Sequence, residues 1–435
     1  MSSWITVPFQ IDTPMFLGGA GQACDPGAQF VPSLRGALRF WFRALVGPAY
    51  GENTTGLANA EAMVFGWAAE DGKPWGSSPI RFRLESHAAL IAVPKRPEDI
   101  KQITDDTPKV FPEWALHKNR LSRDFFGVTY LLGPGLWHRK CGLMRGFLQP
   151  GDGSILVSCP EDLREVLGCC LWALSRYGGL GSRNRKGFGS LSFHDLPSAL
   201  NRAASPSPQT WADVARDAQE RVAKLVGSDR PALPLVVSTL PSYPRLDTTA
   251  MLVPRTDPEA EPMINTIVEA FDTQDSWPGW QQAMGEMGQR WRRLRTVENT
   301  NNRQYAPLVE TPEWREVFVD DETDEFAVGA LGLPLIYGHA APRIQVNLAA
   351  SNGDEMRLPS PIRFRIHRCP DGKYKASVLS LACVSVPDGT TLLATQQGHQ
   401  TRTLELSESL TLWRISSAMK ALNEPAVWTN YEWPG

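Results

Sequence analysis

The chain has 435 residues, 42% of them hydrophobic and 21% charged, a composition that excludes a disordered or fibrous protein. Because a single core seldom grows beyond roughly 250 to 300 residues, the length predicts two domains. The formal net charge of -3 does not indicate a polyanion-binding surface over the whole chain, so local clusters of charge carry the argument.

Two further classes are excluded by local patterns. The sequence has no run of about 18 apolar residues, and its first twelve residues lack the pattern of a secretory signal, so we expect a cytosolic protein. The 7 cysteines form no Cys-x-x-Cys pair and show no zinc-ligand spacing with histidine, so we expect reduced, mostly buried thiols and no metal site.

The first predicted elements are a strand over Trp4 to Ile11 and a helix over Ser33 to Val46. A Pro-Ser pair suits the start of this helix, and Gly47-Pro48 suits its end. Its apolar positions, which include Trp41, recur at helical spacing and predict one buried face.

Three arginines, Arg35, Arg39 and Arg43, follow one another at four-residue steps along the flank of that helix. Like charges at this spacing destabilise an isolated helix by about 0.2 to 0.5 kcal/mol per pair, so an external anion such as a phosphate backbone is a candidate partner. A solvated basic face, or pairing with acids from elsewhere in the fold, explains the stripe equally well. The segment alone leaves both interpretations open.

The next predicted elements are a strand over Ser78 to Ser86, a helix over Glu161 to Tyr177 and a strand over Phe188 to Phe193. A glycine-rich basic loop, Gly178 to Gly189, joins the last two. Glycines allow close approach of a ligand, and arginine binds phosphate with two parallel hydrogen bonds. The candidate phosphate-binding residues of the loop are Gly181, Ser182, Arg183, Asn184, Arg185, Lys186, Gly187 and Gly189.

Nucleotide-binding motifs do not fit this loop. A P-loop or a Rossmann fingerprint leads into a helix, whereas here a strand follows. A flexible connection between helix and strand remains the structural alternative.

A stretch rich in Pro, Ser and Ala, residues 196–210, marks the predicted domain boundary. It divides the chain into an N-terminal domain, residues 1–197, and a C-terminal domain, residues 211–435.

An internal repeat favours duplication of one domain. The hexapeptide Ser-Pro-Ile-Arg-Phe-Arg occurs at residues 78–83 and again at residues 360–365, each time after a Gly-containing turn. Its alternation is typical of a strand and places Arg363 and Arg365 on one face. This face could lie beside RNA or a neighbouring subunit. Chance recurrence and an ordinary exposed strand are the alternatives.

The helix with its Leu-Arg-Phe-Trp-Phe-Arg centre and the glycine-rich loop together resemble the RAMP (repeat-associated mysterious protein) superfamily. The turn at Arg145-Gly146-Phe147 is also similar to a strand-entry turn of that family. Within the superfamily the helix motif is most similar to the first subunit of the Cmr complex, the type III-B CRISPR effector. The resemblance covers residues 4–193 and is thinner afterwards.

The resemblance implies an α+β fold of two tandem ferredoxin-like (RRM-like) domains, with antiparallel sheets backed by helices. It implies an RNA-binding, non-catalytic subunit that contacts guide RNA near its 3′ region or captures target RNA, with other Cmr-type subunits as partners and no cofactor. The arginine stripe and the glycine-rich loop are expected to lie side by side and to grip one sugar-phosphate chain.

The alternative function is metal-independent cleavage of guide-precursor RNA, which some RAMP proteins perform with His, Tyr or Lys as acid and base. The candidates for this are His117, Lys118, Tyr130, His138 and Lys140, and their spacing marks no catalytic pair. Carboxylates such as Asp124, Asp152 and Glu161 likewise form no recognisable metal-binding set, so we expect no catalytic residues.

Overall fold

The structure is a computed structural model of the full chain. It describes residues 4–18, 24–67, 76–92, 111–112, 116–117, 120–121, 123–133, 135–138, 140–193, 196–197, 200, 210–227, 243–244, 246, 250–252, 263–265, 268–295, 297–298, 308–309, 312–333, 335–337, 344–383, 386, 390–396 and 399–424.

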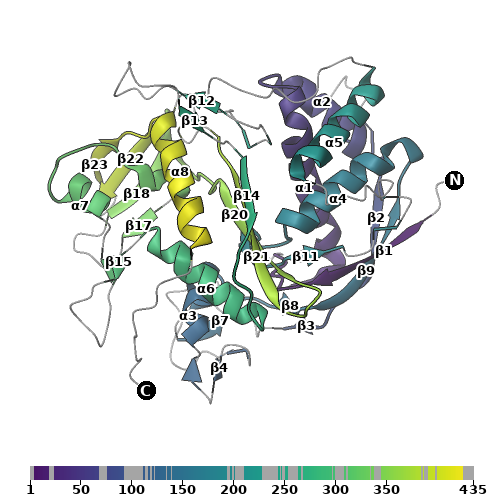
Figure 1. Ribbon diagram of the computed structural model, residues 1–435, viewed down its shortest axis with the longest axis horizontal. Coiled ribbons are helices and arrows are strands. Elements are labelled where there is room, and N and C mark those ends of the chain that lie inside the picture. Colours follow the sequence, from purple (N-terminus) through teal and green to yellow (C-terminus); the bar gives the residue numbers. More distant parts are fainter. Residues whose placement is uncertain are drawn as a thin grey trace.

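The helices and strands of the described residues are numbered in chain order (Figure 1). The helices are α1 Pro26–Val46, α2 Thr54–Phe65, α3 Arg123–Leu132, α4 Arg164–Tyr177, α5 Trp211–Val226, α6 Trp280–Arg293, α7 Pro312–Phe318 and α8 Glu408–Asn423, with short 3-10 helices η2 Gly47–Ala49, η5 Glu161–Leu163 and η6 Ala327–Leu331. The strands of the first half are β1 Ile5–Ile11, β2 Arg81–Ser86, β3 Leu90–Ile91, β4 Leu116–His117, β5 Arg120–Leu121, β6 Trp137–His138, β7 Gly142–Leu143, β8 Phe147–Leu148, β9 Gly151–Ser158, β10 Lys186–Gly187 and β11 Leu191–Ser192. Those of the second half are β12 Ala250–Leu252, β13 Met263–Asn265, β14 Val268–Asp272, β15 Val297–Glu298, β16 Leu308–Val309, β17 Leu335–Tyr337, β18 Ile344–Ala350, β19 Glu355–Met356, β20 Ile362–Arg368, β21 Tyr374–Leu381, β22 Thr390–Gln396 and β23 His399–Leu404.

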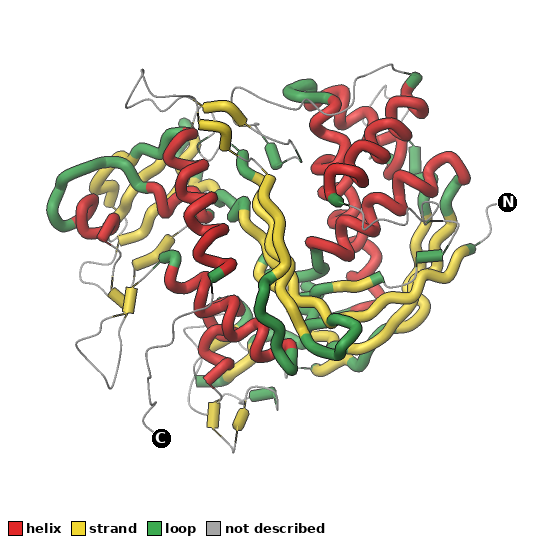
Figure 2. The backbone as a smooth tube through the Cα atoms, viewed as in Figure 1, coloured by secondary structure: helices red, strands yellow, loops and turns green. Residues whose placement is uncertain are grey.

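The first half is built on a four-stranded antiparallel sheet in the order β11-β1-β9-β2. Apolar residues alternate along β1, where Val7, Phe9 and Ile11 are buried, so one face of the sheet forms the core. Helices α1 and α4 pack on this sheet, and α5 packs on both helices (Figures 1 and 2). The predicted strand at residues 4–11 and the helix at 161–177 are confirmed.

Helix α1 begins earlier than the sequence predicted. The side chain of Asp25 accepts a hydrogen bond from the backbone N of Ala28 at 3.1 Å, and Pro26 occupies the first helical position. Asp25 and Pro26 together are typical of a helix N-terminus. The first backbone N–H groups of a helix have no partner within it, and proline has no N–H to leave unpaired there. Pro32 lies inside the helix on its exposed side. The start at Ser33, placed at the Pro-Ser pair, is therefore wrong.

The second half is built on a sheet in the order β10-β20-β21-β14, with α6 and α8 against it. Three of these strands are antiparallel neighbours, but β10 pairs parallel to β20 at Lys186 and Gly187. Because β10 belongs to the glycine-rich loop, the loop of the first half extends the sheet of the second.

The hexapeptide repeat has the same local structure in both halves. In each copy the serine hydroxyl donates to the carbonyl of the isoleucine, at 2.8 Å for Ser78 and 3.1 Å for Ser360. A preceding glycine with positive φ packs against each serine: a Cβ on Gly66 would lie 2.5 Å from the backbone N of Ser78, and one on Gly332 would lie 2.8 Å from that of Ser360. The two segments thus share their glycine and their turn, which favours duplication over chance.

The two halves interlock. Helix α5, which falls inside the predicted C-terminal domain, packs on α1 and α4, and Gln219 donates to the carbonyl of Leu45 at 2.8 Å. Helix α3 of the first half crosses α6 where glycines meet, since a Cβ on Gly127 would lie 1.9 Å from the carbonyl oxygen of Gly285. One hydrophobic core cluster runs through both halves. The core thus continues across the predicted boundary between residues 197 and 211. That the two sides are separate domains stays a prediction.

A further antiparallel sheet, β17-β18-β22-β23 with β19 beside β18, has its own hydrophobic cluster. The expected α+β class, with several antiparallel sheets and helices packed on them, is confirmed. Within the part of the chain that the structure describes, no helix has the length and apolar character needed to cross a membrane. None of the 7 cysteines, all of which are described, forms a disulfide, and Cys141, Cys159, Cys169 and Cys170 are buried.

Candidate nucleic-acid interface

The arginine stripe of α1 has an acidic partner inside the fold. Arg39 and Arg43 each place a guanidinium nitrogen 2.9 Å from a carboxylate oxygen of Glu61, a residue of α2 that is 2% exposed. Arg39 also donates to the carbonyls of Phe65 and Gly66, at the end of α2. The expectation that an external anion neutralises these two arginines is therefore wrong, because α2 supplies a buried carboxylate.

An arginine of the second half makes the same kind of contact with backbone carbonyls, which indicates that the contacts of Arg39 serve the fold. Arg295, just after α6, donates to the carbonyl of Leu331 at 2.7 Å, at the end of η6 and beside the second glycine turn. Arg39 and Arg295 thus satisfy carbonyl groups that the ends of α2 and η6 leave unpaired. Arg35 is half-buried, and its Nε has no hydrogen-bond partner among the described residues.

The glycine-rich loop is held in one conformation by backbone contacts. The N–H of Leu180 donates to the carbonyl of Gly189 and the N–H of Ser182 donates to that of Phe16, at 2.9 and 2.8 Å. Gly189 has a φ of 61°, and a Cβ there would lie 1.9 Å from the carbonyl oxygen of Leu180. Because this backbone is packed, the alternative of a flexible connector does not describe the loop.

Lys186 does not face solvent. Its Nζ is buried without a hydrogen-bond partner among the described residues, and it lies 3.0 Å from the centroid of the Trp291 ring. Burial, followed by nearby arginines, lowers the pKa of Lys186 well below its ordinary value. In this arrangement its amine cannot contact a phosphate, contrary to the expectation. Gly187 is buried beside it, and its carbonyl accepts from the hydroxyl of Thr13 at 2.6 Å.

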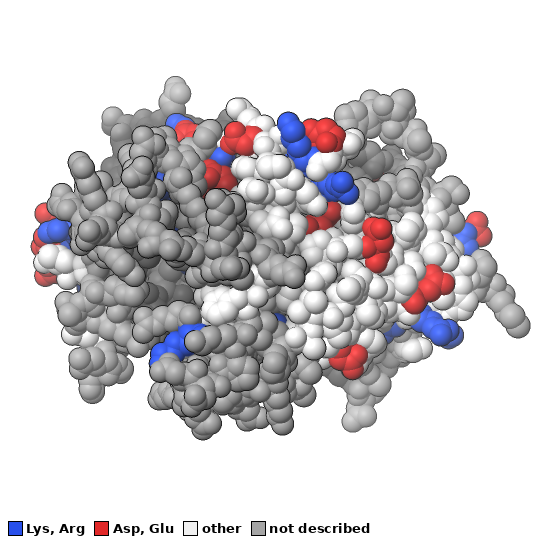
Figure 3. All heavy atoms as spheres, turned by 90° about the horizontal axis from the view of Figure 1, so that it is seen from below, with Lys and Arg blue, Asp and Glu red and all other residues white. Residues whose placement is uncertain are grey.

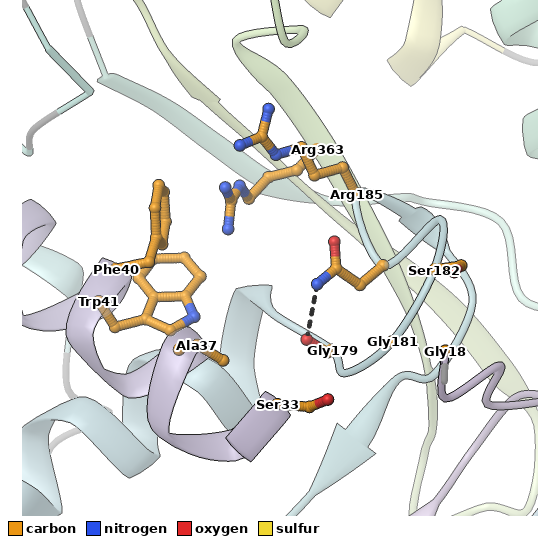
Figure 4. Close-up of a pocket in the computed structure, with 12 residues that line it drawn as sticks. Gly18, Ser33, Ala37, Phe40, Trp41, Gly179, Gly181, Ser182, Arg185 and Arg363 are labelled. Carbon is orange, nitrogen blue, oxygen red and sulfur yellow. Dashed lines mark hydrogen bonds between the residues drawn. The ribbon is translucent and has the colours of Figure 1, made fainter. Parts of the chain in front are cut away.

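The loop and α1 lie side by side and line a cavity of about 420 Å³, but the arginine stripe, which was expected to face the loop, is not part of the lining. The helix contributes a stripe different from the arginine stripe, about 130° away around the axis at 100° per residue. From the helix come Ser33, Gly36, Ala37, Phe40 and Trp41, from the loop come Gly179, Gly181, Ser182, Asn184 and Arg185, and Gly18 and Arg363 complete the lining (Figure 4).

Two guanidinium groups, of Arg185 and Arg363, point together over the aromatic side chains of α1 in Figure 4. The Arg363 guanidinium carbon lies 4.1 Å from the centroid of the Phe40 ring and 4.9 Å from that of Trp41. Neither guanidinium makes a hydrogen bond or ion pair with a described residue. Burial lowers the pKa of both arginines, and for Arg363 the neighbouring Arg185 lowers it further. An anion between the two would relieve this repulsion.

The remaining loop residues divide between structural and accessible positions. Asn184 lines the cavity, and its Nδ2 donates to the carbonyl of Gly179 at 3.1 Å. Arg183 is exposed, with a φ of 62° that non-glycine residues seldom adopt. Its guanidinium lies against Gly133 and is only partly desolvated; this burial first, then Arg295 and Arg357, lower the pKa of Arg183.

Arg365 has a structural role that the sequence did not indicate. Its side chain is on the same strand face as that of Arg363, but it lies 2.8 Å from the carboxylate of Asp12 in an ion pair whose two members are both buried. The suggestion that Arg365 lies beside RNA is therefore wrong, because the buried carboxylate of Asp12, the residue after β1, forms an ion pair with it.

Gly36 is a lining residue that sequence reasoning did not select. It is exposed in the middle of α1, and a Cβ there would have nothing within 4 Å. Glycine inside a helix costs about 0.5 to 1 kcal/mol relative to alanine, and here no packing requires it. The helix backbone at Gly36 therefore forms an open part of the cavity wall.

The nuclease candidates are not brought together by the described contacts. His138 accepts a hydrogen bond from the backbone N of Lys140 at 3.3 Å, and Tyr130 packs against the core. Lys118 and the side chains of His117 and Asp124 lie outside the described residues. Among the described residues no group of three or more His, Cys, Asp or Glu could hold a metal ion, and Asp152 and Glu161 are exposed.

One face of the molecule shows how the charged side chains of the described residues are distributed. On the face drawn in Figure 3, basic and acidic side chains of the described residues are interspersed. This face therefore offers no uniformly basic patch among the described residues.

Comparison with known proteins identifies the class of the first half. Residues 9–192 match the model of the RAMP superfamily, and they contain β1, α1, β9, α4 and the glycine-rich loop. The resemblance drawn from the two motifs is thus confirmed by a match to the model of that superfamily.

The particular relatives are subunits of one kind of complex. The chain is 30% identical over 162 residues to the CRISPR system Cmr subunit Cmr1-1 of Pyrococcus furiosus, covering 37% of this chain and 39% of that protein. It is 28% identical over 193 residues to subunit Cmr1-2 of the same organism, covering 43% of this chain and 94% of that protein. The match thus spans about two fifths of the length of Cmr1-1. The crystal structure of Cmr1 from Pyrococcus furiosus in its apo form aligns with a TM-score of 0.46 at 15% identity, covering 95% of this chain and 96% of that one.

Proposed function

We propose that this protein is an RNA-binding, non-catalytic subunit of a type III-B CRISPR effector complex of the Cmr type. It works in the cytoplasm in antiviral defence, where it contacts guide RNA near the 3′ region or captures target RNA. Its partners are these RNAs and the neighbouring subunits of the complex.

One observation supports the RNA-binding part most. The cavity between α1 and the glycine-rich loop holds the guanidinium of Arg185, which no described carboxylate neutralises. Ser182 and Asn184 add polar groups. Gly36 has no side chain, so an RNA strand can approach the backbone of α1 closely there. Such a set favours a sugar-phosphate backbone, because guanidinium and small polar groups read phosphate and ribose without selecting a base.

The same proposal extends to the fold. The connection strand, helix, strand, strand, helix, strand in the sheet order β11-β1-β9-β2 fits a ferredoxin-like domain, the architecture of many RNA-recognition modules. In the second half, β14, α6, β20, β21 and α8 follow each other in the corresponding order. We therefore keep two tandem ferredoxin-like domains as part of the proposal, with the β17-β18-β22-β23 sheet as an insertion.

The experiment is purification of the tagged full-length protein from its native host. We expect other Cmr-type subunits and a guide RNA to come with it, identified by mass spectrometry and RNA sequencing. Incubation of labelled guide-precursor RNA with the same preparation, with and without this subunit, tests the non-catalytic part. Recovery without subunits and RNA would reject the assignment, and cleavage that depends on this chain would favour the nuclease alternative.

A further inference from the structure

The C-terminal half contributes a side chain to the cavity in the first half. Arg363 leaves strand β20 and crosses to α1, where its guanidinium stacks on Phe40 with 4.1 Å between the guanidinium carbon and the ring centroid. The family match ends at residue 192, so it does not include Arg363. The residue is 8% exposed, and the exposed part lies at the cavity.

The backbone holds the two arginines in register. The N–H of Phe364 donates to the carbonyl of Arg185 at 3.1 Å, in the parallel pairing of β10 with β20. Arg185 and Arg363 are therefore adjacent on neighbouring chain segments. The Phe40 ring beneath Arg363 fixes the plane of its guanidinium, since a cation over an aromatic ring is attracted to its face.

We infer that Arg185 and Arg363 form a clamp for one phosphodiester of a single-stranded RNA, with Phe40 as the platform that orients Arg363. This inference rests on the proposed function and assigns a binding role to the C-terminal half. A cavity of about 420 Å³ has room for about one nucleotide. Two guanidinium groups can each offer parallel N–H donors to phosphate oxygens, a geometry that lysine does not reproduce.

The repeat supplies a matched control. Arg81 occupies the position in the first hexapeptide that Arg363 occupies in the second, and it is exposed on β2. The same substitution can therefore be made at both positions, once in the clamp and once on an outer strand.

The test measures affinity of the full-length protein for a short, labelled single-stranded RNA of mixed sequence as a function of salt. We expect Arg363→Gln to weaken binding about tenfold or more, because a charged hydrogen-bonded contact is lost. It should also flatten the plot of log Kobs against log salt by about 0.7, the contribution of one phosphate on a single strand. Arg81→Gln should match the wild type in both quantities. Arg363→Lys should keep the slope and lose affinity.

The outcomes separate the two proposals. If the wild type binds RNA and Arg363→Gln binds it equally well with the same slope, the clamp is wrong and the proposed function stands. If the wild type binds no RNA, alone or in its purified complex, both are rejected. A third outcome would also overturn the clamp. If polyglutamate displaces the RNA at the same concentration of charge, and Arg363→Gln weakens polyglutamate binding as much as it weakens RNA binding, the site takes an acidic protein segment. If Arg363→Gln does not fold, Arg363→Lys decides, since wild-type affinity in that variant contradicts a planar two-arginine clamp.

Discussion

The exposed glycine of α1 gives a test in which stability and binding should change in opposite directions. Gly36→Ala places a methyl group where nothing lies within 4 Å, so the only effect on folding is the helix preference. The free energy of unfolding should rise by about 0.5 to 1 kcal/mol. A leucine at the same position also favours the helix, but its side chain would occupy the cavity and should weaken RNA binding strongly.

The control is a glycine of the neighbouring helix. A Cβ on Gly168 of α4 would lie 2.1 Å from the carbonyl oxygen of Leu200, so Gly168→Ala should lower stability. Urea denaturation followed by tryptophan fluorescence measures the first effect, and RNA titration measures the second. Wild-type RNA affinity in Gly36→Leu would refute the reasoning that a ligand approaches this wall, whatever the stability of the variant.

Three further predictions concern buried charge. The lowered pKa of Lys186 means that the folded state binds this proton less well than the unfolded chain, so stability should rise with pH as it approaches 10.5, by at most about 1.4 kcal/mol per pH unit. Lys186→Met should be more stable at neutral pH and lack this slope in denaturation series at several pH values; parallel profiles for both proteins would contradict it. Arg39→Ala should lower stability by about 1.5 to 3 kcal/mol through its lost contacts with Glu61 and the end of α2, without a selective loss of RNA affinity in titrations of the folded variant. Asp12→Asn should cost about 3 to 5 kcal/mol, because it leaves Arg365 charged, buried and without its carboxylate; a change in unfolding midpoint within the error of the wild type would show that the pair is not needed.

The sequence was most informative where the signal is local. Periodicity placed β1 and α4, and Trp41 is buried with 1% exposure as its place on the apolar face predicted. The repeated hexapeptide and its preceding glycine also proved to be one structural unit used twice. These features depend on residues close together in the chain, which is why pattern alone could find them.

Tertiary partners explain the errors. Nothing near Arg39 and Arg43 in the sequence indicates Glu61, which reaches them only because α2 folds back on α1. The same holds for Asp12 and Arg365, which are separated by most of the chain. A regular stripe of like charges therefore indicated a partner correctly, but could not say whether that partner is a ligand or another helix of the same protein.

The sequence indicated some of the residues that line the cavity and missed others. Arg185 and Ser182 were selected for their residue types in a glycine-rich loop, whereas Phe40 and Gly36 were treated as parts of a helix motif without a role at a site. A glycine in the middle of an otherwise strong helix pattern was a usable signal, because it costs stability. No local signal places Arg363 over Phe40, since that contact depends on how the two halves dock.

The most direct test of the account is to locate bound RNA on the chain. The native complex is irradiated with ultraviolet light, digested, and the crosslinked peptides are mapped by mass spectrometry. We predict crosslinks on the peptide that contains Phe40 and on those that carry Ser182 and Arg185. Crosslinks confined to α8 or to the β17-β18-β22-β23 sheet, with none in the cavity wall, would contradict it.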